Sequence, residues 1–202
     1  MFEGIITPIV TPFNRDKEES INYEATEKLI NYLIEHGVKG IFILGSNGEF
    51  HVVDEDEKVE FAKKVVEIVN KRVPVFVGTG CCSTRATVRL SKKMEEIGAD
   101  ALSVITPYFL KPTDENLYAH YKAVAQSVNI PIVLYNIPKA TGCPLSPELV
   151  DRLADIPNIK AIKDSSGELE RIQAYAKIAE NKTGAAMALG SFIGYAPAMF
   201  CF

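Results

Sequence analysis

The 202-residue sequence has no block of basic residues, no long apolar run and few cysteines or histidines. Its formal net charge is −4, so it lacks the basic charge pattern of a nucleic-acid-binding protein. No apolar stretch approaches the ~18 residues that span a bilayer. The first residues, "MFEGIITPIVTPF", lack the basic start and long apolar segment of a signal peptide. We therefore expect a cytoplasmic protein with neither a nucleic-acid nor a membrane partner.

The cysteines and histidines argue against a disulfide framework and against a zinc site. Cys81 and Cys82 are adjacent, and none of the four cysteines belongs to a C-x-x-C pair. The three histidines, at positions 36, 51 and 120, do not have the spacing of metal ligands. We expect free thiols in a reducing compartment. With 47% hydrophobic residues, the chain is long enough to bury one sizeable core.

Short apolar runs rich in valine and isoleucine alternate with amphipathic segments. The runs are too short for core helices and are typical of strands buried on both faces of a parallel sheet; they lie at 4–10, 40–44, 74–78, 101–105, 131–135 and 159–163. The helical patterns between them cover 22–36, 54–70, 83–97, 114–128, a segment capped by Ser146, and 169–181. One strand and one helix recur about every 30 residues, which predicts an α/β fold.

The regular repeat favours a (β/α)₈ TIM barrel over a doubly wound sheet. A doubly wound sheet would carry a glycine-rich phosphate turn after its first strand, but here that turn reads "TPFNRD". Six βα units are clear, and "AMAL" (186–189) is expected to form a seventh strand. Such barrels typically take about 250 residues. We therefore expect 1–202 to be a single TIM-barrel domain, truncated after about the seventh strand, without the eighth βα unit and the C-terminal helical region.

Lys163 closes the last apolar run, in "IKAIKDSSG" (159–167). A lysine at a strand end ordinarily extends into solvent, and we expect this of Lys160. Lys163 instead shares a face of the pleat with Ile159 and Ala161, and active sites of barrels lie at the C-terminal ends of the strands. An amine held among apolar groups loses solvation, so its pKa falls and it becomes a nucleophile that forms a Schiff base with a ketone.

Two further strand ends complete the candidate site. Tyr135 ends the preceding strand, where its phenol is placed to relay protons, although a rim tyrosine is often only a core residue. The turn "GSNGE" (45–49) follows the second strand. Gly-Ser-Asn-Gly is ordinary turn chemistry, but its amides, with the side chains of Ser46 and Asn47, can also form a site for a small carboxylate.

Five motifs together resemble the dihydrodipicolinate synthase / N-acetylneuraminate lyase family of class I aldolases. They occur in the order and at the spacing of the family, and the resemblance covers roughly residues 1–190: "GIITPIVTPF", "GSNGE", "TPYF", "LYNIP" and "IKDSSG". The resemblance implies a TIM barrel, usually a homotetramer, that binds pyruvate or another 2-keto acid. It implies Lys163 as the Schiff-base lysine, Tyr135 as the proton relay, and Ser46 and Asn47 as the donors to the pyruvate carboxylate. No metal or organic cofactor is implied.

Three departures from the family pattern bear on the aldehyde partner. Dihydrodipicolinate synthases usually have two threonines where this chain has Ser46 and Asn47, a second tyrosine at Phe109, and an arginine at Ala140. The alanine resembles the 2-keto-3-deoxy sugar acid aldolases. The sequence therefore predicts an aldolase or lyase acting on a 2-keto-3-deoxy sugar acid, with 4-hydroxy-tetrahydrodipicolinate synthase as the alternative. A further alternative is an inactive, truncated remnant, and a phosphate-binding barrel enzyme is a weaker one.

Overall fold

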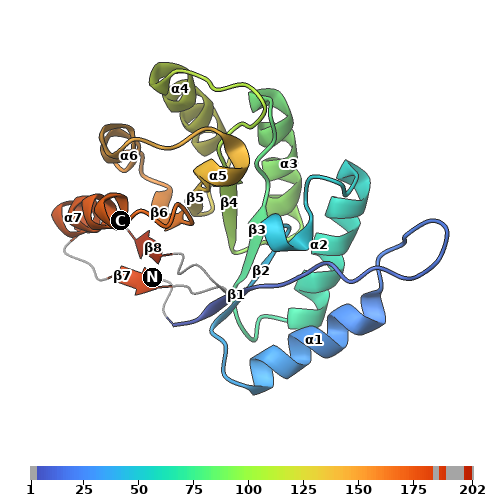
Figure 1. Ribbon diagram of the computed structural model, residues 1–202. Helices are drawn as coiled ribbons and strands as arrows, with labels where there is room; N and C mark the ends of the chain where they lie inside the picture. Colours follow the sequence, from blue (N-terminus) through green and yellow to red (C-terminus); the bar gives the residue numbers. More distant parts are fainter. Residues whose placement is uncertain (1–3, 184–186, 190–197, 202) are drawn as a thin grey trace.

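Six parallel strands form a curved sheet in the computed structural model, which describes residues 4–183, 187–189 and 198–201. Each strand pairs with the next one along the chain, so the sheet curls into an open half-barrel (Figure 1). The strands are β1 (Ile6–Pro8), β2 (Gly40–Ile43), β3 (Val75–Gly78), β4 (Ala101–Ile105), β5 (Ile132–Asn136) and β6 (Ile159–Asp164). This confirms the predicted α/β TIM-barrel class.

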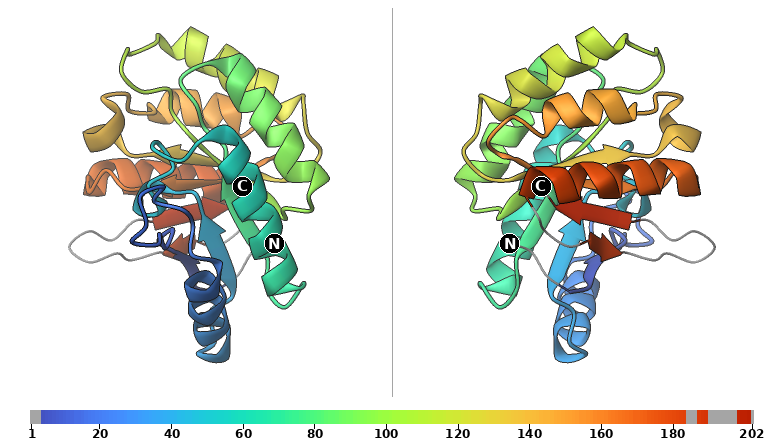
Figure 2. Two further views of the ribbon diagram at one scale, coloured as in Figure 1. Left: turned by 90° about the vertical axis from the view of Figure 1, so that its right-hand side faces the viewer. Right: turned by 90° about the vertical axis from the view of Figure 1, so that its left-hand side faces the viewer.

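The helices lie along the outer face of the curved sheet (Figures 1 and 2). The longer ones are α1 (Tyr23–Glu35), α2 (Glu55–Val69), α3 (Thr84–Glu96), α4 (Asp114–Ala125), α6 (Pro147–Leu153) and α7 (Leu169–Thr183). Helix α6 begins as its sequence predicts, because the Ser146 hydroxyl accepts a hydrogen bond from the Leu149 amide at 3.1 Å. Gly98 follows α3 with a φ of 89°, a conformation that favours glycine. Among the described residues, no helix has the length and apolar character of a membrane span.

The sheet is buried on both faces. Its outer face packs against the helices in the main hydrophobic core, and every residue of β2, β3, β4 and β5 is buried. A second, smaller cluster occupies the concave face and takes one residue from each of five strands: Phe42, Phe76, Ala101, Val133 and Ala161. Burial on both sides explains why the strands read as continuous apolar runs instead of alternating ones.

The predicted seventh strand is present but does not extend the parallel sheet. Strand β7 (Met187–Leu189) pairs antiparallel with β8 (Ala198–Cys201), and β8 pairs antiparallel with β6. Ala186, the first residue of the predicted strand, lies outside the described residues. The free backbone groups on the edge of β6 are therefore paired by a strand that runs in the opposite direction. The seventh strand that the sequence predicts thus forms over Met187–Leu189, but it pairs with β8 and not with β6.

A bulge in β6 changes which of its residues share a face of the sheet, compared with the prediction from the sequence. Ile132 of β5 is opposite Ile159, whereas the next residue, Val133, is opposite Ala161, so Lys160 is an extra residue on β6. Ile159 consequently packs in the outer core, while Ala161 belongs to the concave cluster. Lys160 is exposed, as predicted. The bulge means that Lys163 does not share a face with Ile159.

Candidate active site

Lys163 lies against two aromatic rings at the end of β6. Its Nζ is 3.9 Å from the centre of the Tyr135 ring and 4.9 Å from the centre of the Phe42 ring. Tyr135 is its neighbour in the register of β5 and β6. Loss of water around the ammonium lowers the pKa of Lys163 below its usual value, and the contact with Tyr135 partly offsets that effect. A lysine with a lowered pKa has a larger fraction of neutral, nucleophilic amine near neutral pH.

The Tyr135 hydroxyl connects the lysine to the turn that follows β2. Its oxygen lies 3.3 Å from Oγ of Ser46, and the Tyr135 side chain is buried. The structure thus brings Lys163, Tyr135 and Ser46 together, although three different strand ends supply them. Asn47 lies in the same turn and is half-buried. Within the described part of the chain, no hydrogen bond joins its side chain to Tyr135 or Lys163, so its role stays a prediction.

The "GSNGE" segment folds into a short 3₁₀ turn (η1, Ser46–Gly48). The amides of Gly48 and Glu49 donate to the carbonyls of Gly45 and Ser46 at 3.0 and 3.2 Å. Those two amides are thus used within the turn, and the roles of the Ser46 and Asn47 side chains as donors to a carboxylate stay predictions. Oγ1 of Thr11 donates to the Gly48 carbonyl at 2.7 Å, so the segment after β1 holds the turn in place.

A buried polar network fixes the ends of β5 and β6. Nδ2 of Asn136 donates to Asp164 at 2.6 Å, and its Oδ1 accepts from the Leu145 amide at 3.0 Å. The Ser166 hydroxyl donates to the other carboxylate oxygen of Asp164 at 2.6 Å. Asn136 directly follows Tyr135 in the sequence, and Asp164 directly follows Lys163. The network therefore holds the backbone of both candidate catalytic residues at a fixed separation.

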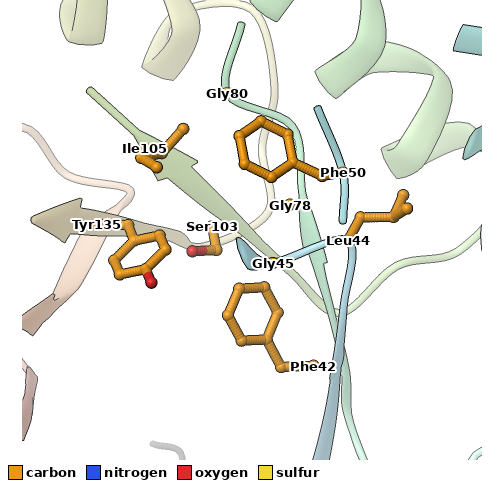
Figure 3. Close-up of a pocket in the computed structure, with 9 residues that line it drawn as sticks. All are labelled: Phe42, Leu44, Gly45, Phe50, Gly78, Gly80, Ser103, Ile105 and Tyr135. Carbon is orange, nitrogen blue, oxygen red and sulfur yellow. The ribbon is translucent and has the colours of Figure 1, made fainter. Parts of the chain in front are cut away.

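Two residues of the site were not found from the sequence, Phe42 and Ser103. Figure 3 shows both facing the same hollow as Tyr135, inside the curved sheet. The hollow is close to the size of one water molecule. Oγ of Ser103 is buried and has no hydrogen-bond partner among the described residues. The alternation of side chains along β2 and β4 places both residues on the concave face, but it does not indicate which neighbours they meet.

A model of the dihydrodipicolinate synthetase family matches residues 1–185. The chain belongs to this family. A 4-hydroxy-tetrahydrodipicolinate synthase from Clostridium perfringens is 44% identical over 180 residues, which make up 89% of this chain and 60% of the relative. The chain thus spans about 60% of the length of the curated relatives that it matches.

Solved structures of the dihydrodipicolinate synthase family have the same fold over the part that this chain covers. Dihydrodipicolinate synthase from Acinetobacter baumannii, complexed with pyruvate, is 40% identical with a TM-score of 0.86, over 90% of this chain and 62% of that chain. YagE, a prophage protein of the family from E. coli K12, also in complex with pyruvate, is 36% identical with a TM-score of 0.90. That match covers 95% of this chain and 64% of YagE.

Two of the three departures from the usual dihydrodipicolinate synthase pattern, Phe109 and Ala140, lie at the surface. Phe109 is 92% exposed and has a φ of 80°, next to the exposed Leu110. Tyr108, its neighbour, packs edge-on against Phe50, and burial together with Cys82 raises the pKa of Tyr108 to about 12. Ala140 is exposed in the short helix α5 (Pro138–Thr141). Neither Phe109 nor Ala140 carries a polar group to offer a substrate.

Proposed function

We propose that the chain forms a Schiff base between Lys163 and pyruvate. The observation that carries this proposal is the position of the Lys163 amine, held against the Tyr135 ring with a lowered pKa at the C-terminal end of a barrel strand. Relatives with the same fold have been solved in complex with pyruvate, which supports the choice of ligand. Ser46 and Asn47 lie in the turn after β2, and we assign their side chains as donors to the pyruvate carboxylate.

The reaction follows from the chemistry of an amine beside a phenol. The neutral amine attacks the keto carbon, and the carbinolamine loses water to give a cationic iminium. Loss of a proton from the pyruvate methyl group gives an enamine, which adds to the carbonyl carbon of an aldehyde. Water then hydrolyses the new iminium, which releases the product and restores the lysine. Tyr135, 3.3 Å from Ser46 Oγ, relays the protons of carbinolamine formation and breakdown.

Aspartate semialdehyde is the first candidate for the aldehyde. The curated relatives at 44% identity are named 4-hydroxy-tetrahydrodipicolinate synthase, and this favours condensation of pyruvate with that semialdehyde over the sugar acid reaction expected from the sequence. The family resemblance alone does not separate the two reactions, because both use the same pyruvate enamine. The similarity to these relatives therefore puts the reaction with aspartate semialdehyde before the sugar acid reaction.

Cleavage of a 2-keto-3-deoxy sugar acid is the second candidate, and two residues favour it. Ala140 stands where the resemblance predicts an arginine for the semialdehyde carboxylate, and Phe109 lacks the hydroxyl of the second tyrosine. A polyhydroxylated aldehyde does not need a cationic side chain at position 140.

An activity comparison separates these candidates. The 202-residue protein is assayed for pyruvate consumption with aspartate semialdehyde and for pyruvate release from a 2-keto-3-deoxy sugar acid, with Lys163→Ala as the control. We expect condensation with the semialdehyde, lost in the variant. Release of pyruvate from the sugar acid alone would favour the second candidate. Absence of both reactions would favour the inactive protein that the sequence left open.

A homo-oligomer is a further part of the proposal, supported by the family resemblance and by the exposed Phe109 and Leu110. Light scattering of the purified chain tests it directly, since a monomer mass at micromolar concentration would contradict it. The cytoplasmic location stays a prediction.

A further inference from the structure

We propose that Phe42 is a positioning residue for the reactive nitrogen, and that the rings of Phe42 and Tyr135 form a two-sided aromatic seat that stabilises the cationic forms of Lys163. Stabilisation of the Lys163 ammonium does not depend on the proposed function. Stabilisation of the iminium rests on the proposed Schiff-base chemistry.

The seat is built from two strands and a close backbone approach. The Phe42 ring is buried, lies 4.9 Å from Nζ of Lys163, and meets the Tyr135 ring edge-on with centroids 6.5 Å apart at 80°. Gly45 packs directly over the same ring, because a Cβ there would lie 3.1 Å from both Cε1 and Cζ of Phe42. The ring is thus held between Gly45 and Tyr135, and its orientation toward the lysine is fixed.

The groups around the ammonium of Lys163 that can stabilise it are the Tyr135 phenol and the faces of the two aromatic rings. From β5, the titratable group that faces Lys163 is the Tyr135 phenol. Asp164, the next residue on β6, is engaged with Asn136 and Ser166 in the buried network. From β2 and its turn, the neighbours are Phe42 and, through Tyr135, Ser46. Within residues 4–183, no carboxylate forms an ion pair with Lys163. A cation without a counter-ion is stabilised by the negative face of an aromatic ring.

This arrangement suits a lysine that must be neutral for attack and cationic afterwards. Burial lowers the pKa of Lys163 and so supplies the free amine. The iminium that follows carries a permanent positive charge on the same nitrogen. A ring face stabilises that charge without adding a carboxylate, which would raise the pKa of the amine and remove the nucleophile.

Acetylation of the free protein by trace acetic anhydride, followed over a pH series by peptide mass mapping of Lys163, tests the seat without substrate. Phe42→Leu keeps the site apolar but removes the ring face, so the ammonium loses stabilisation. We expect the labelling midpoint of Lys163 to fall by about 0.5 pH unit. Phe42→Met, which fills the volume with an unbranched side chain, should give the same shift if Phe42→Leu folds poorly. Phe42→Tyr keeps an aromatic ring and should therefore have the same labelling midpoint as the wild-type protein.

Phe61→Leu is the matched control, because Phe61 is fully buried in α2 on the outer side of the sheet. It should lower stability without moving the midpoint. If Phe42→Leu and Phe42→Met leave the midpoint unchanged, the ring is only packing. If the midpoint rises, the ring acts by excluding water. Either outcome would overturn the inference.

Borohydride trapping with pyruvate adds the second readout. Where wild-type protein forms the adduct, Phe42→Leu should lower the equilibrium fraction of iminium at limiting pyruvate by about two-fold or more, and Phe42→Tyr should restore it. An unchanged fraction would contradict the iminium part. Failure of wild-type protein to form any adduct would reject the proposed function and the iminium part together, while the acetylation midpoints would still decide the ammonium part.

Discussion

Lys163 gives the clearest prediction at the scale of a residue, because burial of an ammonium opposes folding. Its folded pKa lies below the unfolded one, so the unfolded chain binds more protons and stability rises with pH between the two values. Lys163→Met should raise the free energy of unfolding at neutral pH by about 1 kcal/mol and flatten this alkaline rise. Denaturant titrations at several pH values measure both effects. A loss of stability on substitution would contradict the view that the lysine is retained for chemistry at the expense of the fold.

Ser103 gives a second prediction at this scale. Its buried hydroxyl finds no partner among the described residues, so it carries a desolvation cost without a compensating hydrogen bond. Ser103→Ala should therefore leave stability unchanged or raise it by up to about 1 kcal/mol in the absence of substrate. Thermal melting measures the change. A marked fall in melting temperature would indicate that the hydroxyl is already engaged in the unliganded protein.

The residues of the site were predictable to different degrees. Lys163, Tyr135 and Ser46 follow from their positions at the ends of strands, because the carboxyl ends of parallel strands meet at one edge of the sheet. Phe42 was missed, since its contact with Lys163 depends on the curvature of the sheet and on the close approach of Gly45 to the ring. The sequence alone carries neither quantity.

At the scale of secondary-structure elements, the Asn136–Asp164 hydrogen bond ties β5 to β6. Asn136→Ala should lower the free energy of unfolding by about 2 kcal/mol, because the Leu145 amide and the buried Asp164 carboxylate each lose a partner. The exposed Asn129 offers a control, since Asn129→Ala should cost less than about 0.5 kcal/mol. Similar losses in the two variants would show that the network does not hold the strand ends.

Most helices and strands could be predicted from local sequence signals. The predicted boundaries of β4 and the start of α6 match the structure because apolar runs, Ser146 and Pro147 are local signals. The bulge at Lys160 and the antiparallel pair β7–β8 were not predictable in this way. The bulge depends on the register of β5 with β6, and the β7–β8 pair depends on which strand edge is available for pairing. The tertiary arrangement decides both.

At the scale of the whole molecule, the main core runs without interruption along the outer face of the sheet. We propose from this that the 202 residues fold as one domain. Thermal unfolding followed by far-ultraviolet circular dichroism and by tyrosine fluorescence should give one transition with the same midpoint for both probes. Two separated transitions would show that part of the chain folds independently of the rest.

The central claim is that Lys163 is the nucleophile of a Schiff base. The most direct measurement is borohydride reduction of the protein in the presence of pyruvate, followed by peptide mass mapping. The account predicts one stable adduct, on Lys163, dependent on pyruvate and absent from Lys163→Ala. Unmodified protein, or label spread over other lysines such as the exposed Lys160, would contradict it.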